Sequence, residues 1–339
     1  MIRELWDLID GFDERPDDWG KPYFSQQKYY KPKAIDIDNF QEFDIQEEDK
    51  VLCCVDGGNN KIFETPSESI HLLRIYFNLF RGKKRVENIE PLSLYLSCDH
   101  QDDEITVGSR KVNDSIPIGS VEYVVKKEEM DNGRPVNAAH TVRKYLEWET
   151  IKYVSENYLE EGDIILRDGV LQTGVEGERE YAEEAYESVE DNGVHLMGLA
   201  KTCTLRTTCG FPLVAAIQEL STEFSKGPWY YHPIAENEHP DHKGEMMVVK
   251  YHRNSNYAFR TEFYRELDNP VEDILGYIAF QAQDPIFLGY PYGLVDADKR
   301  ARVTDEEIDY LKSVGFNRMG RTFKNKVSTL DAHDKLSEL

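Results

Sequence analysis

The order of apolar segments between residues 51 and 200 places the strongest constraint on how this chain folds. Three short runs rich in β-branched and aromatic residues come first and predict strands. A stretch without glycine or proline follows, with apolar residues at helical spacing. The expected elements are strands at 51–56, 69–80 and 92–98, a helix at 137–158, a strand at 163–167, a helix at 176–190 and a strand at 194–200.

Three strands, a helix, a strand, a helix and a strand form the order of a ribonuclease H-like α/β core. In that core an antiparallel hairpin is extended by parallel strands through helical crossovers. We therefore expect a mixed sheet flanked by helices. The predicted organisation is an N-terminal arm at 1–45, a main domain at 46–320 with its core at about 50–202, a polar insertion at about 99–135, a C-terminal elaboration at about 203–320 and a polar tail at 321–339.

The charge balance excludes a protein that coats nucleic acid through bulk positive charge. Lysine and arginine total 40 against 64 acidic residues, a net charge of −24. A metal-dependent nuclease remains compatible, because it needs clustered carboxylates and a divalent cation inverts the local field. No run of 18 apolar residues occurs, and acids occupy the opening residues, so we expect a cytoplasmic protein without membrane association.

Two aspartates occupy similar positions in the predicted sheet. Asp56 and Asp168 each end an apolar strand and each precede a glycine. Asp-Gly is also a common turn dipeptide, so either one alone favours a turn. Together, on strands expected to be neighbours, the two carboxylates indicate a site for a divalent cation, and oxygen ligands favour Mg²⁺ or Mn²⁺ over zinc. Lys201 follows the last core strand and should reach the same edge, where it could contact a phosphate.

Five segments in order along the chain resemble the NurA nuclease family. They are VDGGNN at 55–60, DIILRDGVL at 163–171, GLAKT at 198–202, PWYYHP at 228–233 and GYPYGLVDADKRAR at 289–302. The resemblance implies a ribonuclease H-like fold, a homodimer and Mn²⁺-dependent single-strand endonuclease and 5′-to-3′ exonuclease activity on DNA. Mg²⁺ is the alternative ion, with one or two ions per site. It further implies a hexameric HerA-type ATPase as partner in processing double-strand-break ends.

The same resemblance implies which residues form the site. The metal ligands would be Asp56, Asp168, a helix glutamate and Asp298, at a position where many family members have histidine. An R-x-x-L-E pattern favours Glu147 as the helix glutamate, with Glu149 as the alternative. The family lysine falls on Lys201.

Residues for binding DNA are expected near these motifs. We predict contacts from Arg143, Tyr290, Tyr292 and Arg300, with Lys144, Arg206, Lys299 and Arg302 as further basic candidates. The aromatic cluster at 229–231 would either stack bases or pack in the core or a dimer interface. His239 and His242 lie in a polar segment, where we expect solvent exposure and no metal.

Two alternatives remain at this point. VDGGNN also resembles the first phosphate loop of actin-like and sugar-kinase phosphotransferases, but the second half of the chain contains no matching second loop. The chain could instead be a catalytically inactive scaffold for the translocase. The joint presence of four acids and the lysine disfavours the scaffold.

Overall fold

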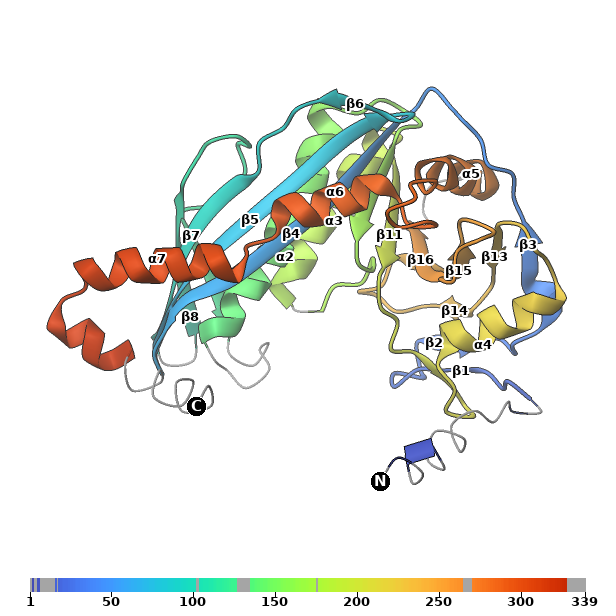
Figure 1. Ribbon diagram of the computed structural model, residues 1–339, viewed down its shortest axis with the longest axis horizontal. Helices are drawn as coiled ribbons and strands as arrows, with labels where there is room; N and C mark the ends of the chain where they lie inside the picture. The colour runs from blue at the N-terminus through green and yellow to red at the C-terminus, as the bar shows by residue number, and fades with distance from the viewer. Residues whose placement is uncertain are drawn as a thin grey trace.

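The computed structural model describes residues 2, 5, 6, 16, 18–101, 104–126, 135–174, 176–264 and 270–327. Its main feature is a large mixed sheet with helices on both faces (Figure 1). Within the described residues this sheet has the strand order β3-β13-β15-β16-β11-β10-β4-β5-β7-β8-β9, and β6 pairs with β5.

The elements of the first half are β1 (Pro22–Tyr23), β2 (Tyr30–Pro32), β3 (Phe40–Glu42), β4 (Val51–Glu64), β5 (Glu68–Arg81), β6 (Lys84–Glu87), β7 (Leu92–Gln101), β8 (Glu104–Lys111), β9 (Glu122–Lys126) and α2 (Pro135–Asn157). Those of the second half are β10 (Ile164–Asp168), α3 (Glu176–Asp191), β11 (His195–Ala200), β12 (Arg206–Thr207), α4 (Leu213–Leu220), β13 (Trp229–Tyr231), β14 (Ala235–Asn237), β15 (Gly244–Lys250), β16 (Phe259–Tyr264), α5 (Val271–Gln281), α6 (Tyr292–Ala301) and α7 (Asp305–Arg318).

The centre of the sheet confirms the ribonuclease H-like fold. Strands β4, β5 and β7 pair antiparallel, whereas β10 runs parallel to both β4 and β11. The helices α2 and α3 connect β9 to β10 and β10 to β11, and they pack against each other. This is the predicted hairpin extended by parallel strands through helical crossovers.

Strand β4 differs from the sequence-based expectation, because it does not turn after Asp56. It continues through the two glycines to Glu64, paired with β5 over almost its whole length. A Cβ atom at Gly57 would lie 2.8 Å from Glu147 Oε1 of α2, and one at Gly58 would lie 2.3 Å from the Ala301 carbonyl of α6. Successive strand residues face opposite sides of a sheet. The glycines therefore allow two helices to approach β4 from opposite faces.

The predicted insertion and the segment before the last helix also contain regular structure. Residues 104–111 and 122–126 form β8 and β9, which extend the sheet beyond β7. Residues 292–301 form helix α6 across β4 and β5 (Figure 1). Helix α6 places Asp296 and Asp298 over the centre of the sheet.

The described part of the N-terminal segment packs against the second half of the chain. Strands β1, β2 and β3 pair with β12, β14 and β13. Their apolar residues join those of α4 and β15 in a second core that includes Trp19, Tyr30, Phe40 and Trp229. Helix α7 packs on the far end of β4 through Ile308 and Phe63. Among the described residues, no helix combines the length and the apolar character that crossing a membrane requires.

Candidate metal centre

Three carboxylates from distant parts of the chain meet at the middle of the sheet. Asp56 lies on β4, Asp168 ends β10 and Asp298 lies on α6. One oxygen from each carboxylate lies within 4.8 Å of the others. Such a set of hard oxygen donors suits Mg²⁺ or Mn²⁺. The structure thus brings together the two aspartates predicted from the strand pattern and the aspartate implied by the resemblance.

Lys201 joins two of these acids. It follows β11, and its Nζ atom lies 2.5 Å from Asp168 Oδ2 and 2.7 Å from Asp298 Oδ1. Arg302 contacts the other oxygen of Asp298 at 2.7 Å. Asp56 accepts a hydrogen bond from the Gly57 amide at 2.8 Å. Lysine and arginine thus neutralise part of the charge, chiefly at Asp298 and Asp168.

The electrostatics of the cluster reflect this uneven pairing. Burial, together with the charges of Asp168 and Glu147, raises the pKa of Asp56 to about 7. Burial also raises the pKa of Asp168, and Lys201 opposes that rise. The pKa of Asp298 is lowered: burial would raise it, but Lys201 and Arg302 outweigh that effect. A divalent cation would relieve the repulsion at Asp56 most.

Glu147 is near Asp56 and Asp168, whose pKa values its charge raises, but it is not a member of the set of three aspartates, and two arginines hold it. Its Oε1 atom accepts a hydrogen bond from Arg143 at 2.6 Å, and its Oε2 atom accepts one from Arg167 at 2.9 Å. Arg143 also donates to the Gly57 carbonyl at 2.8 Å. Glu149 lies elsewhere, because its contacts include the Gly119 backbone and its charged neighbours Glu184 and Lys111. Of the two helix glutamates, Glu147 is the one near the centre.

The comparisons with known proteins identify the family. The protein-family model described as the NurA domain matches residues 50–303, which is most of the chain. The chain belongs to the NurA family of nucleases. No curated protein sequence matches it.

Solved structures similar to this NurA-family chain include nucleases. The NurA nuclease from Sulfolobus solfataricus has 12% identity and a TM-score of 0.49, with 93% of each chain covered. The catalytic domain of human endonuclease V has 13% identity and a TM-score of 0.35, covering 82% of this chain and 92% of that one. Argonaute from A. aeolicus has 12% identity and a TM-score of 0.33, covering 76% of this chain and 29% of that one. The family assignment depends on the domain match, because these similarities are weak.

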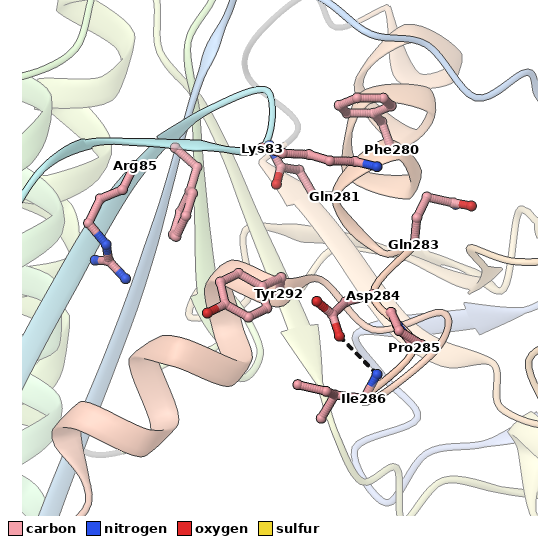
Figure 2. Close-up of a pocket in the computed structure, with 10 residues that line it drawn as sticks. Lys83, Arg85, Phe280, Gln281, Gln283, Asp284, Pro285, Ile286 and Tyr292 are labelled. Carbon is pink, nitrogen blue, oxygen red and sulfur yellow. Dashed lines mark hydrogen bonds between the residues drawn. The ribbon is translucent and has the colours of Figure 1, made fainter.

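The two tyrosines of the NurA-like C-terminal motif have separate environments. Tyr290 is buried, and its hydroxyl has no hydrogen-bond partner among the residues that the structure describes. Burial, with the nearby charge of Asp168, raises its pKa. Tyr292 begins α6 and lines a cavity of about 540 Å³, together with Phe80, Lys83, Arg85 and Phe280 (Figure 2). Tyr290 therefore lies beside the carboxylate cluster, and Tyr292 lines a separate cavity.

Asp296 and Arg300 form a charge group separate from the centre. Asp296 contacts Arg85 at 2.8 Å, Asn78 at 2.8 Å and Arg300 at 3.3 Å. The guanidinium of Arg300 also lies 5.4 Å from the centre of the Tyr76 ring. Arg85 and Asn78 lower the pKa of Asp296, although burial opposes them. Asp296 is thus satisfied by protein donors, whereas Asp298 two residues later joins the carboxylate cluster with Asp56 and Asp168.

Two expectations about aromatic and histidine residues change. Residues 229–231 form β13 and are buried, so they pack in the core and are not available for base stacking. The expectation that His239 and His242 are exposed is wrong, because both are buried. His242 contacts Tyr30 Oη at 2.9 Å and Glu262 Oε2 at 3.1 Å. The N-terminal segment and β16 enclose this histidine, and neither is near it in sequence.

Sequence reasoning missed Arg167 as part of the site. This arginine precedes Asp168 on β10, lies buried against the Trp148 ring at 4.5 Å and holds Glu147. A charged residue inside the apolar run DIILRD was the available signal, since a buried arginine is rare without a paired acid.

Proposed function

We propose that this chain is a divalent-metal-dependent DNA nuclease with Asp56, Asp168 and Asp298 as its metal ligands. The observation that carries the proposal is the convergence of three carboxylates within 4.8 Å. Within the described part of the chain, Lys201 and Arg302 contact them, and neither forms an ion pair with Asp56. A hard cation satisfies the remaining negative charge, and phosphodiester hydrolysis is the chemistry expected of a family of nucleases.

Each residue of the centre has a role in this proposal. The three aspartates hold the cation, which supplies Lewis acidity to the phosphate and to an attacking water. Lys201 leaves its contacts with Asp168 and Asp298 and faces the scissile phosphate. Glu147 remains a predicted ligand, and it would bind the cation while keeping its bonds to Arg143 and Arg167. These arginines fix the carboxylate of Glu147 before any cation binds.

The proposed ion is Mn²⁺, with Mg²⁺ as the alternative and one or two ions per site. Many relatives have histidine where this chain has Asp298, as the family resemblance implies. An oxygen ligand in place of a nitrogen ligand should make the centre more tolerant of Mg²⁺. The ratio of cleavage rates with the two ions tests this point.

Membership in the NurA family supports a more specific proposal. We propose single-strand endonuclease and 5′-to-3′ exonuclease activity in the resection of double-strand-break ends. The proposed partner is a hexameric HerA-type ATPase, and the proposed state is a cytoplasmic homodimer. Light scattering of the purified protein tests the dimer, and co-purification with the ATPase tests the partner.

Digestion of end-labelled DNA tests the nuclease proposal. Single- and double-stranded substrates are incubated with Mn²⁺, Mg²⁺ or EDTA. We expect cleavage only with a metal ion and a loss of at least roughly 100-fold in Asp168→Asn, because even residues that only support a metal ligand reach that effect. Asp296→Asn is the matched control on α6, since protein donors already satisfy Asp296. It should keep metal-dependent cleavage.

Equal cleavage by wild type, Asp56→Asn and Asp168→Asn would contradict the proposal. So would cleavage that persists in EDTA. The phosphotransferase alternative has no support, because the Gly57-Gly58 segment lies inside a paired strand and forms no phosphate loop. The inactive scaffold predicts no cleavage by any form of the protein, so the same experiment separates it from the nuclease.

A further inference from the structure

An aromatic cavity opens beside the metal centre. Its volume is about 470 Å³, and Lys201, Asp298 and Arg302 form the charged part of its lining. The rest of the lining is apolar: Tyr257, Phe259, Ile286, Phe287, Tyr290 and Val295. Cationic groups and flat apolar rings therefore face one space.

The rings of this cavity run from the centre to the surface. Tyr290 and Phe259 are buried and pack edge to face at 5.2 Å. The centre of the Phe287 ring lies 5.5 Å from that of Tyr290 and 5.4 Å from that of Tyr257, on which it stacks. The outer residues are accessible, since Tyr257 is 55% exposed, Phe287 40% and Ile286 76%. We call Tyr257, Ile286 and Phe287 the aromatic shelf.

Two loops hold the shelf in place. A Cβ atom at Gly289, whose φ is +87°, would lie 2.6 Å from the side chain of Ser255, so the loops before β16 and α6 are in close contact. Ser255 Oγ accepts a hydrogen bond from the Tyr257 amide at 3.0 Å. The Asn256 carbonyl accepts one from Gln218 of α4 at 2.7 Å. These contacts order the shelf before any ligand binds, which lowers the entropic cost of binding.

We propose that Tyr257 and Phe287 stack against one or two unpaired bases of the strand whose phosphodiester lies at the metal centre. This inference rests on the proposed nuclease function. With a net charge of −24, the chain attracts phosphate only where cations are local, and Lys201 and Arg302 line the same cavity as the rings. In a duplex, neighbouring base pairs cover the face of each base. The aromatic shelf thus selects a single strand without reading its sequence.

Binding of labelled oligonucleotides tests the aromatic shelf. All proteins carry Asp168→Asn to stop cleavage, and fluorescence anisotropy reports the affinity for a 20-nucleotide single strand. Tyr257→Ala should weaken binding roughly five- to hundred-fold, the effect of removing one stacked ring. Tyr257→Phe keeps the ring and should bind like the parent. Tyr310→Ala is the control, because Tyr310 is 68% exposed on α7 and is not part of the cavity lining.

Abasic positions distinguish stacking from a merely structural effect. An abasic site is moved along the strand one nucleotide at a time. In the parent protein, one or two positions should weaken binding, and the same positions should have no further effect in Tyr257→Ala. An equal abasic penalty in both proteins overturns the inference, as does unchanged affinity in Tyr257→Ala.

Two further outcomes separate this inference from the function on which it rests. Tyr257→Ala with an altered oligomeric state in light scattering and unaltered DNA affinity makes the shelf a protein contact and overturns the inference. A wild-type protein that cleaves DNA but shows no effect of Tyr257→Ala on binding overturns the shelf alone. A wild-type protein that cleaves no DNA with any metal ion overturns both the nuclease and the shelf.

Discussion

Asp56 of β4 and Glu262 of β16 are both buried acids on the central sheet, and their surroundings are opposite. Glu262 is fully buried and receives hydrogen bonds from Arg260 Nε at 2.7 Å and from the Leu171 amide at 2.7 Å. His242 lies 3.1 Å from it. Burial alone would raise its pKa, but Arg260, His242 and the Leu171 amide outweigh burial and lower it to about 2.

Asp56 is 9% exposed and accepts a hydrogen bond from the Gly57 amide. Burial and two acidic neighbours, Asp168 and Glu147, raise its pKa to about 7. The folded chain therefore satisfies the charge of Glu262 and leaves that of Asp56 unbalanced. An acid saturated with donors serves the fold, whereas an acid held among other acids requires a cation from outside.

The largest expected effect is on the side of Glu262. Glu262→Ala leaves Arg260 and His242 buried without their acid, and breaking a buried pair costs about 3–5 kcal/mol. Urea unfolding measures the free-energy change. Glu184→Ala is the control, since Glu184 is 60% exposed in its pair with Lys152, and a surface pair contributes about 0–1 kcal/mol. If Glu262→Ala and Glu184→Ala lost equal free energy of unfolding, Glu262 would stabilise the fold no more than a surface acid does. The contrast between Glu262 and Asp56 would then fail.

Binding of a metal ion at Asp56 should stabilise the fold. A ligand at 100 times its Kd adds about 2.7 kcal/mol to the free energy of unfolding. Adding Mn²⁺ to EDTA-treated wild type should therefore raise its Tm, whereas Asp56→Asn should respond little. Asp296→Asn should keep the full response, because Asp296 pairs with Arg85. A metal response of equal size in Asp56→Asn would place the cation elsewhere.

The sequence predicted Asp56 and Asp168 because they depend on local patterns. Each ends an apolar run before glycine, and the crossover order makes their strands neighbours. Only the family resemblance singled out Asp298 among the acids near the C-terminus, because α6 approaches β4 through a contact between Gly58 and the Ala301 carbonyl. No spacing within residues 289–302 encodes that contact. The fold of the core was thus predictable, whereas the third carboxylate of the cluster was not predictable from local pattern.

The surroundings of the two acids were the least predictable part. The i,i+4 spacing of Arg143 and Glu147 favours a pair within helix α2. Arg167, in contrast, reaches Glu147 from strand β10. His242 lies among polar residues and still becomes buried, since Tyr30 and Glu262 enclose it from distant segments. Burial of a polar group depends on long-range packing, and a single sequence does not specify it.

In the metal-free protein, Asp56→Asn should raise the free energy of unfolding, whereas Glu262→Ala lowers it, and the effect should be smaller. Asp56→Asn removes repulsion and should stabilise the metal-free protein by about 0.5–2 kcal/mol, as substitutions at strained functional sites commonly do. Unfolded aspartate loses its proton near pH 3.9, whereas folded Asp56 keeps its proton until about pH 7. Asp56 therefore lowers the stability of the metal-free fold as the pH rises from about 4 to about 7, and this loss should be absent in Asp56→Asn.

Urea unfolding in EDTA at several pH values measures this effect. Glu262 gives the opposite dependence, because its lowered pKa makes its stabilisation disappear as the pH falls from about 4 towards 2. The two windows do not overlap, so one titration separates the two acids. A metal-free Asp56→Asn protein that is less stable than wild type at pH 8 would contradict the claim that Asp56 is unbalanced.

The smallest effect is expected for Arg302, the exposed counterpart of Arg260. Its side chain is 63% exposed and pairs with Asp298 at 2.7 Å, so Arg302→Gln should change the free energy of unfolding by less than about 1 kcal/mol. If Arg302 instead contacts a phosphate at the cavity, the slope of log affinity against log salt should become less steep by about one. Anisotropy titrations at several salt concentrations measure that slope. A loss of several kcal/mol in stability with an unchanged slope would make Arg302 a structural partner of Asp298, like Arg260 of Glu262.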